Sequence, residues 1–325
     1  MKIEKMENIG TSCKSRSLRH SGESRIGVRG RRRNPKSLEN SGFRVALRLP
    51  GMTLFSCFQE FCKSLIGVKS KKWGSFLLTL LVLPFLMGQA PYTPPSNSWK
   101  KVDEGFEVRS MHLQGQPYQI PFKLRALRLE ITRFPVRVID SRDFGANRLD
   151  IKTMVQKSQA LGAVNGGFFL PDYKPLGLLI VDGRETSPLR KADWGVFLIQ
   201  DNVPKITHTK DFLPDKNISQ ALQVGPRLVV GGRELTMKRQ IARRSAVGIT
   251  YKNQVVLVNT EDTDAYAQDL ARIFWLSEDE GGLGCRDALT LDGGPSAQMF
   301  VEYKSLKIDI PGGWGVPNGL GIFKK

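Results

Sequence analysis

Residues 288–296 read Ala-Leu-Thr-Leu-Asp-Gly-Gly-Pro-Ser, and the interpretation of the chain depends most on this stretch. Its apolar first half predicts a short strand that leaves a hydrophobic core. Such a strand would hold the Asp292 carboxylate rigidly, while Gly293 and Gly294 would let backbone N–H groups approach a ligand closely. A tight Asp-Gly turn between two strands would give the same local sequence. The stretch alone leaves the turn and the functional site as alternatives.

A second glycine element favours the functional site. Asn165-Gly166-Gly167-Phe168-Phe169 also follows a short apolar run. Its amide side chain and its two unhindered backbone N–H groups would form a nest for an anion. We therefore predict that Asn165, Gly166 and Gly167 belong to the same site as Asp292.

Two further segments supply charged candidates. Arg243-Arg244 directly precede a predicted strand, and an arginine fork suits phosphate or carboxylate in a bidentate arrangement. One of the two arginines would point inward if it holds an anion; the alternative is that both are solvated. Glu261-Asp262-Thr263-Asp264 could ligate a divalent cation, supply a second catalytic acid, or only cap a helix.

Several common catalytic arrangements have no support in the sequence. None of the three histidines lies close in sequence to a glycine element, which weakens the case for a Ser-His-Asp triad. The chain contains no CxxC, HExxH or P-loop motif, and this argues against a cysteine- or histidine-based metal site. Cys285 has no histidine near it in sequence, so we expect a small buried packing residue.

The start of the chain differs in composition from the rest. The 325 residues have a net charge of +18, and most of the excess positive charge lies near the N-terminus. Residues 1–68 form a basic head, rich in Ser, Gly and Arg, that we expect to be disordered. Binding of nucleic acid by this head would require that it remain on the mature protein. We predict no nucleic-acid partner.

Residues 69–90 have the composition of an export signal, with lysines before an apolar run that ends in small residues. The run is shorter than the roughly 20 residues of a membrane span. We predict an exported protein, periplasmic or secreted. An uncleaved membrane anchor is the alternative, because Pro91 would directly follow a cut at Ala90. A start at Met52 would give a leader of conventional size, so residues 1–51 are either a long extra head or not part of the working protein.

Residues 91–98 form a Pro- and Ser-rich linker, and residues 99–325 form the predicted folded domain. Cys285 is the only cysteine after the export signal, so this domain cannot contain an internal disulfide. Alternating or continuous apolar runs predict strands and hairpins at 125–131, 136–139, 178–184, 228–233 and 249–258.

Two segments have apolar residues at helical spacing. They predict helices at 149–161 and at 264–277, the second with Thr263 or Asp264 as its N-cap. Strands and helices do not alternate regularly. The sequence therefore predicts an α+β fold with a mixed or antiparallel β-sheet core, several hairpins and two or more helices.

Motifs across the domain resemble the phosphodiester glycosidase domain family. They are NGGFF at 165–169, RRSAVGI at 243–249 and LGCRDALTLDGGPSAQM at 283–299, together with PLG at 175–177, VGPR at 224–227 and PNGL at 317–320. The resemblance extends over about residues 125–325. It implies a hydrolase that cleaves the glycosidic bond to phosphate in a sugar-1-phosphodiester of an envelope or extracellular glycan.

The sequence departs from the family pattern in two places. Pro295 stands where many members have a third glycine, and it removes one backbone donor from the expected cradle. Asn259-Thr260-Glu261-Asp262 stands where members often have Asp-Gly-Arg before the late helix. These departures support an alternative hypothesis, a non-catalytic module that binds an anionic polysaccharide during exopolysaccharide production or export.

The resemblance implies roles for the candidate residues. Arg244, with Arg227 as a second candidate, would hold the phosphate. Asp292 would act as a base or electrostatic stabiliser, and Glu261 as a second carboxylate. A phosphate leaving group is already a weak base, so a strong general acid matters less than in ordinary glycoside hydrolysis. Asn165 would be a third catalytic residue, with a positioning role. The remaining substrate-binding groups would be Gly166, Gly167, Gly293, Gly294 and Ser296.

The expected partner is a phosphorylated or anionic glycan. The membrane would be involved only through an uncleaved anchor at 73–90. No motif specifies a cofactor, although the carboxylates at 261–264 are compatible with a divalent cation. The sequence leaves the oligomeric state open.

Overall fold

The computed structural model describes residues 98–325. The predicted head (1–68), the export signal (69–90) and nearly all of the linker (91–98) lie outside the described residues. Among the described residues there are three large β-sheets, a two-stranded ribbon and only two α-helices. The expected helices and hairpins are present, but the fold is more strongly β than the α+β prediction implied.

Every strand pairing of the described residues is antiparallel. This finding decides between the mixed and the antiparallel sheet that the sequence left open. Hairpin connections account for many of these pairings, and a two-residue turn can join strands only in the antiparallel sense.

The largest sheet has eight strands in the order β1-β2-β3-β15-β14-β17-β11-β12. Central strands β14 and β15 are buried along their whole length, which explains why their sequences are nearly continuous apolar runs. The bounds in this sheet are β1 (Lys100–Asp103), β2 (Phe106–Leu113), β3 (Phe122–Leu129), β11 (Arg227–Val230), β12 (Arg233–Glu234), β14 (Ser245–Thr250), β15 (Val255–Thr260) and β17 (Cys285–Thr290).

Two five-stranded sheets complete the core. One has the order β7-β6-β10-β8-β9 and the other the order β19-β18-β5-β20-β4. The strands of the first are β6 (Leu179–Val181), β7 (Arg184–Ser187), β8 (Gly195–Gln200), β9 (Val203–His208) and β10 (Ile218–Val224). The strands of the second are β4 (Val136–Asp140), β5 (Gly162–Asn165), β18 (Met299–Tyr303), β19 (Leu306–Ile310) and β20 (Asn318–Ile322). The ribbon pairs β13 (Ile241–Ala242) with β16 (Ala265–Tyr266).

The predicted hairpins are confirmed. The segment 178–184 forms the turn between β6 and β7, and 228–233 joins β11 to β12. The segment 249–258 joins β14 to β15. Three short 3-10 helices follow strands or loops, and their bounds are η1 (Ser141–Phe144), η2 (Thr209–Asp211) and η3 (Gly294–Ser296).

The two predicted helices are α3 (Ile151–Ser158) and α4 (Ala267–Trp275). The Asp150 carboxylate accepts a hydrogen bond from the backbone N–H of Thr153 at 2.8 Å, so Asp150 caps α3. The predicted cap of α4 at Thr263 or Asp264 is wrong, because its N-cap is Tyr266 and makes no side-chain cap bond. Residues 265–266 are paired as β16, so the helix begins only after that strand ends.

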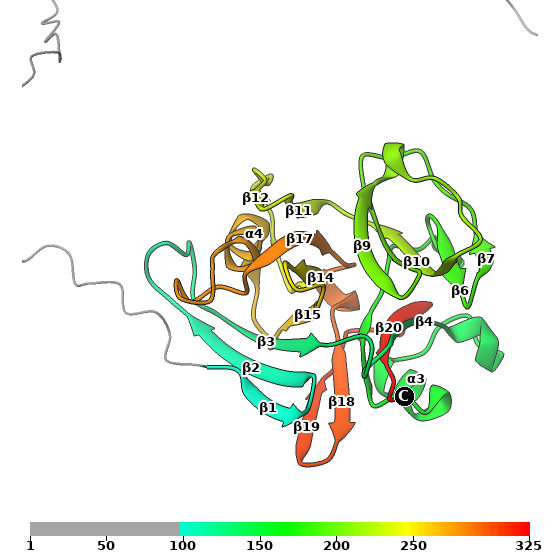
Figure 1. Cartoon of the computed structure of the whole chain (residues 1–325), viewed down its shortest axis with the longest axis horizontal. Coiled ribbons are helices and arrows are strands. Elements are labelled where there is room, and N and C mark those ends of the chain that lie inside the picture. Colours follow the sequence, from blue (N-terminus) through cyan, green and yellow to red (C-terminus); the bar gives the residue numbers. More distant parts are fainter. Residues whose placement is uncertain (1–97) are drawn as a thin grey trace, which may run out of the picture. The chain divides into compact units, whose positions relative to one another are not determined.

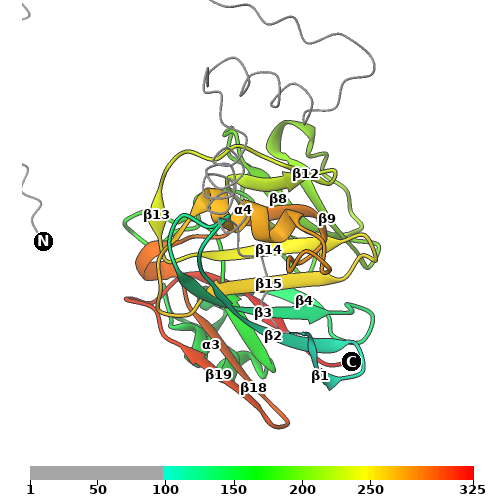
Figure 2. The same ribbon diagram turned by 90° about the vertical axis from the view of Figure 1, so that its left-hand side faces the viewer.

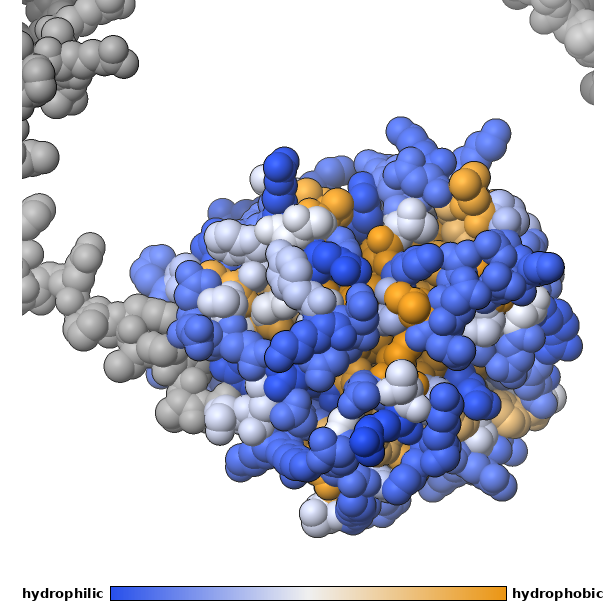
Figure 3. All heavy atoms as spheres, viewed as in Figure 1, coloured by the Kyte–Doolittle hydropathy of each residue, from blue (hydrophilic) through white to orange (hydrophobic). Residues whose placement is uncertain are grey.

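Buried apolar residues from all three large sheets form one central core. Helix α4 covers the opposite face of the eight-stranded sheet, and α3 packs against the sheet that contains β4 and β5. Figure 1 shows α4 beside β11 and β17, and Figure 2 shows α3 on the side of β18 and β19. The face drawn in Figure 3 is mostly hydrophilic, with apolar residues gathered near its centre.

Candidate functional site

The two glycine elements that the sequence singled out lie side by side. Asp292 lies two residues after the end of β17, and Asn165 is the last residue of β5. The backbone N–H of Asp292 donates to the carbonyl oxygen of Gly166 at 2.9 Å. The Asn165 side-chain amide donates to the carbonyl oxygen of Asp292 at 2.7 Å. These two hydrogen bonds join the eight-stranded sheet to the sheet of β5 at Asp292. Asn165, Gly166 and Asp292 therefore lie together, as the sequence predicts.

A buried chain of polar side chains supports this junction. Asn259, Ser245 and Asn165 are each 0% exposed. The Asn259 amide donates to the Ser245 hydroxyl at 2.8 Å, and that hydroxyl donates to the Asn165 side-chain oxygen at 2.6 Å. Asn165 is therefore enclosed by protein and acts on the site by holding the backbone of Asp292. Its catalytic role remains a prediction, and by this geometry it would be a positioning role.

The expected nest of free N–H groups at Gly166 and Gly167 is not formed. The Gly166 N–H donates to the backbone oxygen of Asn318 at 2.9 Å. The Gly167 N–H donates to the Asn318 side-chain oxygen at 2.8 Å. A Cβ on Gly166 would lie 2.1 Å from that side-chain oxygen, so the close approach of Asn318 requires glycine there. The nest prediction is wrong because Asn318, 151 residues further along, already occupies both donors.

The turn after Asp292 is also closed by internal hydrogen bonds. The Gly293 N–H donates to the Asp292 carboxylate at 3.0 Å, and the Gly294 N–H donates to the backbone oxygen of Arg243 at 2.9 Å. Gly294 has a φ of 59°, a conformation that favours glycine. Pro295 lies in the first turn of η3, where a backbone donor is not needed. The glycines of this turn shape the backbone around Asp292, and their predicted contact with substrate remains untested.

The surroundings of the Asp292 side chain favour proton exchange. Burial raises the pKa of the Asp292 carboxyl above the ordinary aspartate value, although hydrogen bonds from the Ser296 hydroxyl and the Gly293 N–H oppose the shift. A carboxylate of raised pKa is a better proton acceptor than an ordinary one. Ser296 is itself buried, and its Oγ accepts a hydrogen bond from the Trp314 indole N–H at 3.0 Å.

Arg244 is the arginine that points inward. It is 7% exposed, and its guanidinium donates to the backbone oxygens of Gln240 at 2.6 Å and Ala265 at 3.3 Å. Burial lowers the pKa of this guanidinium, and the nearby Asp264 acts in the opposite direction. Arg243, in contrast, forms an ion pair with Asp262 at 3.3 Å.

Arg244 lies close to the glycine turn. A Cβ placed on Gly293 would be 4.0 Å from Nη1 of Arg244. No carboxylate of the described residues forms an ion pair with Arg244, so its positive charge is available to an anion that reaches the turn. Burying an arginine without an ion-pair partner is unfavourable for folding. An anionic ligand bound to the guanidinium would offset that cost.

Two predicted residues have side chains that contact other parts of the fold. The side chain of Arg227 packs against Gly195, the first residue of β8, where a Cβ would lie 2.9 Å from its Cγ. The Glu261 carboxylate forms an ion pair with Arg125 at 2.9 Å on the far side of β15. Neither side chain makes a contact with Asp292 among the hydrogen bonds and ion pairs of residues 98–325. Their roles as phosphate ligand and second carboxylate remain predictions.

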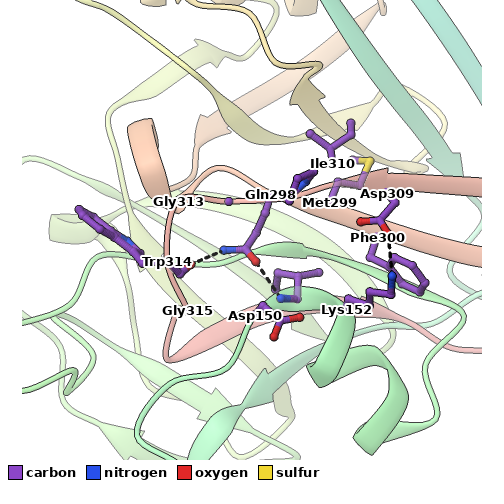
Figure 4. Close-up of a pocket in the computed structure, with 13 residues that line it drawn as sticks. Asp150, Lys152, Gln298, Met299, Phe300, Asp309, Ile310, Gly313, Trp314 and Gly315 are labelled. Atoms are coloured by element: carbon purple, nitrogen blue, oxygen red, sulfur yellow. Dashed lines mark hydrogen bonds and ion pairs between the residues drawn. The ribbon is translucent and has the colours of Figure 1, made fainter.

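A cavity of about 720 Å³ adjoins the turn. Its lining includes Trp314, Gln298, Lys152 and Asp309, and Figure 4 shows Trp314 at one end and the Lys152–Asp309 pair at the other. The Gln298 side chain donates to the Trp314 backbone oxygen at 3.0 Å and accepts from the Ile151 N–H at 2.8 Å, as the dashed lines in Figure 4 indicate. Asp292 does not line this cavity.

Sequence reasoning missed four residues of the site. Ser245, Gln298 and Asn318 stand within motifs that resemble the family but have no predicted role of their own, and Trp314 lies in no motif. A polar residue at the start or end of an otherwise apolar strand was the available signal for Ser245 and Asn318. No local pattern indicates that Gln298 and Trp314 reach the turn.

In residues 98–325 no group of three or more His, Cys, Asp or Glu side chains is arranged to hold a metal ion. None of the helices in the same range has the length and apolar character needed to cross a membrane. Cys285 is buried, as expected for a packing residue, and burial raises the pKa of its thiol.

Comparison with known proteins gives a consistent picture. The family model described as phosphodiester glycosidase matches residues 158–323. The catalytic domain of zebrafish N-acetylglucosamine-1-phosphodiester alpha-N-acetylglucosaminidase, auto-inhibited by its pro-peptide, has a similar structure. Its TM-score is 0.54 and its identity 17%, over 72% of this chain and 89% of that one.

A hypothetical protein from Synechocystis also has a similar structure, with a TM-score of 0.50 and 13% identity. The similarity covers 71% of this chain and 64% of the Synechocystis chain. At such identities the two structures support the fold alone. No curated protein sequence matches the chain.

Proposed function

Because the chain belongs to the phosphodiester glycosidase family, we propose that it hydrolyses the bond between a sugar and phosphate in a sugar-1-phosphodiester. The proposed substrate is an envelope or extracellular glycan. The observation that carries the proposal is that Arg244 and Asp292 both lie at the Gly293 turn. Burial raises the pKa of the Asp292 carboxyl, which directly precedes Gly293, and Nη1 of the buried Arg244 lies 4.0 Å from the position of a Cβ on Gly293.

The proposed reaction divides the work between these two residues. Arg244 binds the phosphate anion and stabilises the charge that grows on it as the bond to the sugar breaks. Water attacks the anomeric carbon, and its proton passes to the Asp292 carboxylate. The products are a free sugar and a phosphate monoester, which finally takes up the proton. The leaving phosphate needs little help from a general acid.

The surrounding residues support this division. Asn165 holds the backbone of Asp292, and Ser296 donates a hydrogen bond to its carboxylate. Gly166, Gly167, Gly293 and Gly294 allow the close packing of backbone that brings Asp292 and Arg244 to one turn. Glu261 could serve as a second carboxylate only if substrate binding releases it from Arg125.

The test is release of free sugar by the 325-residue chain from sugar-1-phosphodiesters, such as esters of N-acetylglucosamine 1-phosphate. Asp292→Asn should lower kcat by about 10²- to 10⁴-fold, the range for loss of a general base. Arg244→Lys keeps the charge but loses the fork, and should lower kcat/KM by about tenfold or more. A parallel assay with a chelator would show whether a divalent cation takes part.

Asp279→Asn is the matched control, because Asp279 is an exposed carboxylate in the turn after α4. It should leave the rate unchanged within about twofold. An Asp292→Asn protein with full activity would remove Asp292 from the mechanism. Full activity of Arg244→Lys would show that catalysis does not need a bidentate contact between Arg244 and the phosphate.

A second candidate function is a non-catalytic module that binds an anionic polysaccharide. The observation that favours it is the state of the glycine amides, because the N–H groups of Gly166, Gly167, Gly293 and Gly294 already donate within the protein. They are therefore not free to stabilise a developing charge. Retained binding of an anionic glycan by Arg244, with no sugar released from any diester, would support this module over the hydrolase.

We also propose that the protein acts outside the cytoplasm, since residues 69–90 have the composition of an export signal. Sequencing the N-terminus of the mature protein tests this. A terminus near residue 91 would indicate a cleaved signal, and it would remove the basic head that nucleic-acid binding requires. A terminus within residues 1–68 in an exported, membrane-associated protein would indicate a retained anchor instead.

A further inference from the structure

We propose that the cavity beside the Asp292 turn binds an uncharged stretch of glycan, with one sugar ring stacked on Trp314. We call it the Trp314 pocket, and its lining includes Trp314, Gln298, Phe300, Lys152 and Asp309. The inference deepens the proposed function and rests on it only for the identity of the substrate. Binding of an uncharged glycan requires no catalysis and can be measured separately.

The first support is the exposure and fixation of Trp314. The residue is 49% exposed, yet its indole N–H is fixed by Ser296 Oγ at 3.0 Å and its backbone oxygen by Gln298 at 3.0 Å. Gln298 is 2% exposed, so Trp314 is held in place by a side chain of the protein interior. An exposed apolar ring that is held in place loses little conformational freedom on binding, which suits it to the apolar face of a sugar.

The second support is the charge of the pocket. The Lys152 ammonium and the Asp309 carboxylate form an ion pair at 2.8 Å, and the Asp150 carboxylate adds a negative charge. A phosphate would meet net negative charge there. An uncharged sugar would instead find the hydrogen-bond donors and acceptors that its hydroxyl groups need, with the ring of Phe300 beneath the Lys152 ammonium at 5.3 Å. The cavity volume lies within the usual range of small-ligand sites, roughly 300–1,000 Å³.

The third support is the position of the pocket relative to Arg244. Gly293, at the start of the turn, faces Arg244. Pro295, two residues later, packs against the pocket wall, where the Gly313 N–H donates to its backbone oxygen at 2.7 Å. A Cβ on Gly312 would lie 2.9 Å from the same oxygen. The cationic and the aromatic sides of the turn are therefore distinct, and Asp292 precedes the turn without lining the pocket.

Hydrogen bonds connect the pocket directly to the carboxylate. The Trp314 indole donates to Ser296 Oγ, and the Ser296 hydroxyl donates to the Asp292 carboxylate. A glycan that stacks on Trp314 would therefore contact the same residue whose indole N–H holds the Ser296 hydroxyl in place. This arrangement places an uncharged sugar on one side of Asp292 and the phosphate on the other.

The experiment measures binding of uncharged trisaccharides of glucose, mannose, galactose or N-acetylglucosamine by isothermal titration calorimetry and saturation-transfer NMR. The 325-residue chain carries Asp292→Asn so that no turnover interferes. Trp314→Ala should weaken binding of the best trisaccharide by about tenfold, the value of a lost aromatic contact. Trp314→Phe keeps a ring and should retain most of the affinity. Lys152→Ala, at an exposed position, should weaken it by about fivefold.

Trp275→Ala is the matched control. Trp275 is 42% exposed, and its indole N–H donates to the Gly232 backbone oxygen at 3.0 Å, so it resembles Trp314 in exposure and fixation. It lies on α4, away from the pocket, and its loss should leave trisaccharide binding unchanged. Arg244→Lys should also leave it unchanged, because the pocket does not use the phosphate site. Equal affinity of Trp314→Ala and the parent, or binding of no trisaccharide to the parent, would overturn the inference.

The outcomes also separate this inference from the proposed function. Trisaccharide binding that depends on Trp314, in a protein that releases sugar from no diester, would support the pocket and contradict the hydrolase. Sugar release that is unaffected in KM and kcat by Trp314→Ala would support the hydrolase and contradict the pocket.

Discussion

At the scale of single residues, Asp292 links function to stability. Burial raises the pKa of its carboxyl, against the hydrogen bonds from Ser296 and Gly293. A carboxyl whose folded pKa exceeds its unfolded value contributes stability that is fully present below the unfolded pKa and is lost as the pH rises through the folded pKa. Above its folded pKa, Asp292 is therefore an ionised carboxylate whose burial is unfavourable for folding.

Asp292→Asn should consequently have a higher thermal midpoint than the parent near neutral pH. The difference should shrink as the pH falls, and it should vanish well below about 3.9, the unfolded aspartate pKa, where the parent carboxyl is protonated in both states. Thermal unfolding followed by far-UV circular dichroism over that pH range measures it. The gain in stability would accompany the loss of activity, as is common where a site has been shaped for function.

The exposed Asp279 supplies the control for this prediction, because Asp279→Asn should show no pH-dependent difference from the parent. An Asp292→Asn protein that is less stable than the parent by the same amount at every pH would contradict the prediction. Such a result would mean that the Asp292 carboxylate is needed for its hydrogen bonds and that its burial has little cost.

At the scale of elements, the chain Asn259–Ser245–Asn165 fastens β14 and β15 to β5. Ser245→Ala removes the hydroxyl that accepts from Asn259 and donates to Asn165. Both amides are 0% exposed, so water cannot replace the lost partner without opening the structure. We expect a loss of about 1–3 kcal/mol in the free energy of unfolding, measured by urea denaturation.

The control for Ser245→Ala is Ser305→Ala, at an exposed serine in the turn between β18 and β19. This change should alter the free energy of unfolding by no more than about 0.5 kcal/mol. If Ser245→Ala were as stable as the parent, the buried amides must find other partners, and the polar chain would not be what joins the sheets.

The elements were largely predictable because their signals are local. Apolar alternation and Gly-containing turns located the hairpins β6–β7, β11–β12 and β14–β15, and helical spacing located α3 and α4. The cap of α4 was predicted wrongly because the pairing of β16 with β13, more than twenty residues earlier in the chain, takes up the residues before the helix. Local propensity contains no information about such a pairing.

The site was predictable only in part, for the same reason. Asp292 and Arg244 stand in local motifs, so the sequence identifies both as candidates, and the structure places both at the Gly293 turn. The nest at Gly166 and Gly167 failed because Asn318 approaches from β20, and the role of Trp314 depends on a loop that folds back over the turn. These contacts between distant segments follow from the packing of three sheets, which periodicity along one strand does not specify.

At the scale of the whole folded part, one core serves all three large sheets. Leu320 of β20 is 0% exposed and belongs to this core, together with Leu222 of β10 and Leu257 of β15 from the other two sheets. Each sheet also has a smaller apolar cluster on its other face, but all three bury one face in this shared core, so loss of the shared core exposes an apolar face of every sheet. Residues 98–325 should therefore unfold as one cooperative unit.

Leu320→Ala tests this cooperativity, and it should lower the free energy of unfolding by about 2–5 kcal/mol through the cavity it leaves. Hydrogen exchange followed by mass spectrometry should then show faster exchange in β10 and β15 as well as in β20, because opening by global unfolding exposes every sheet together. The control is Leu213→Ala, a leucine that is 79% exposed and should change neither value. Faster exchange confined to β4, β5, β18, β19 and β20 would show that their sheet opens on its own. In that case the turn at Asp292, which bridges this sheet and the eight-stranded one, would be the weakest point of the fold, and substrate binding there should protect both sheets from exchange.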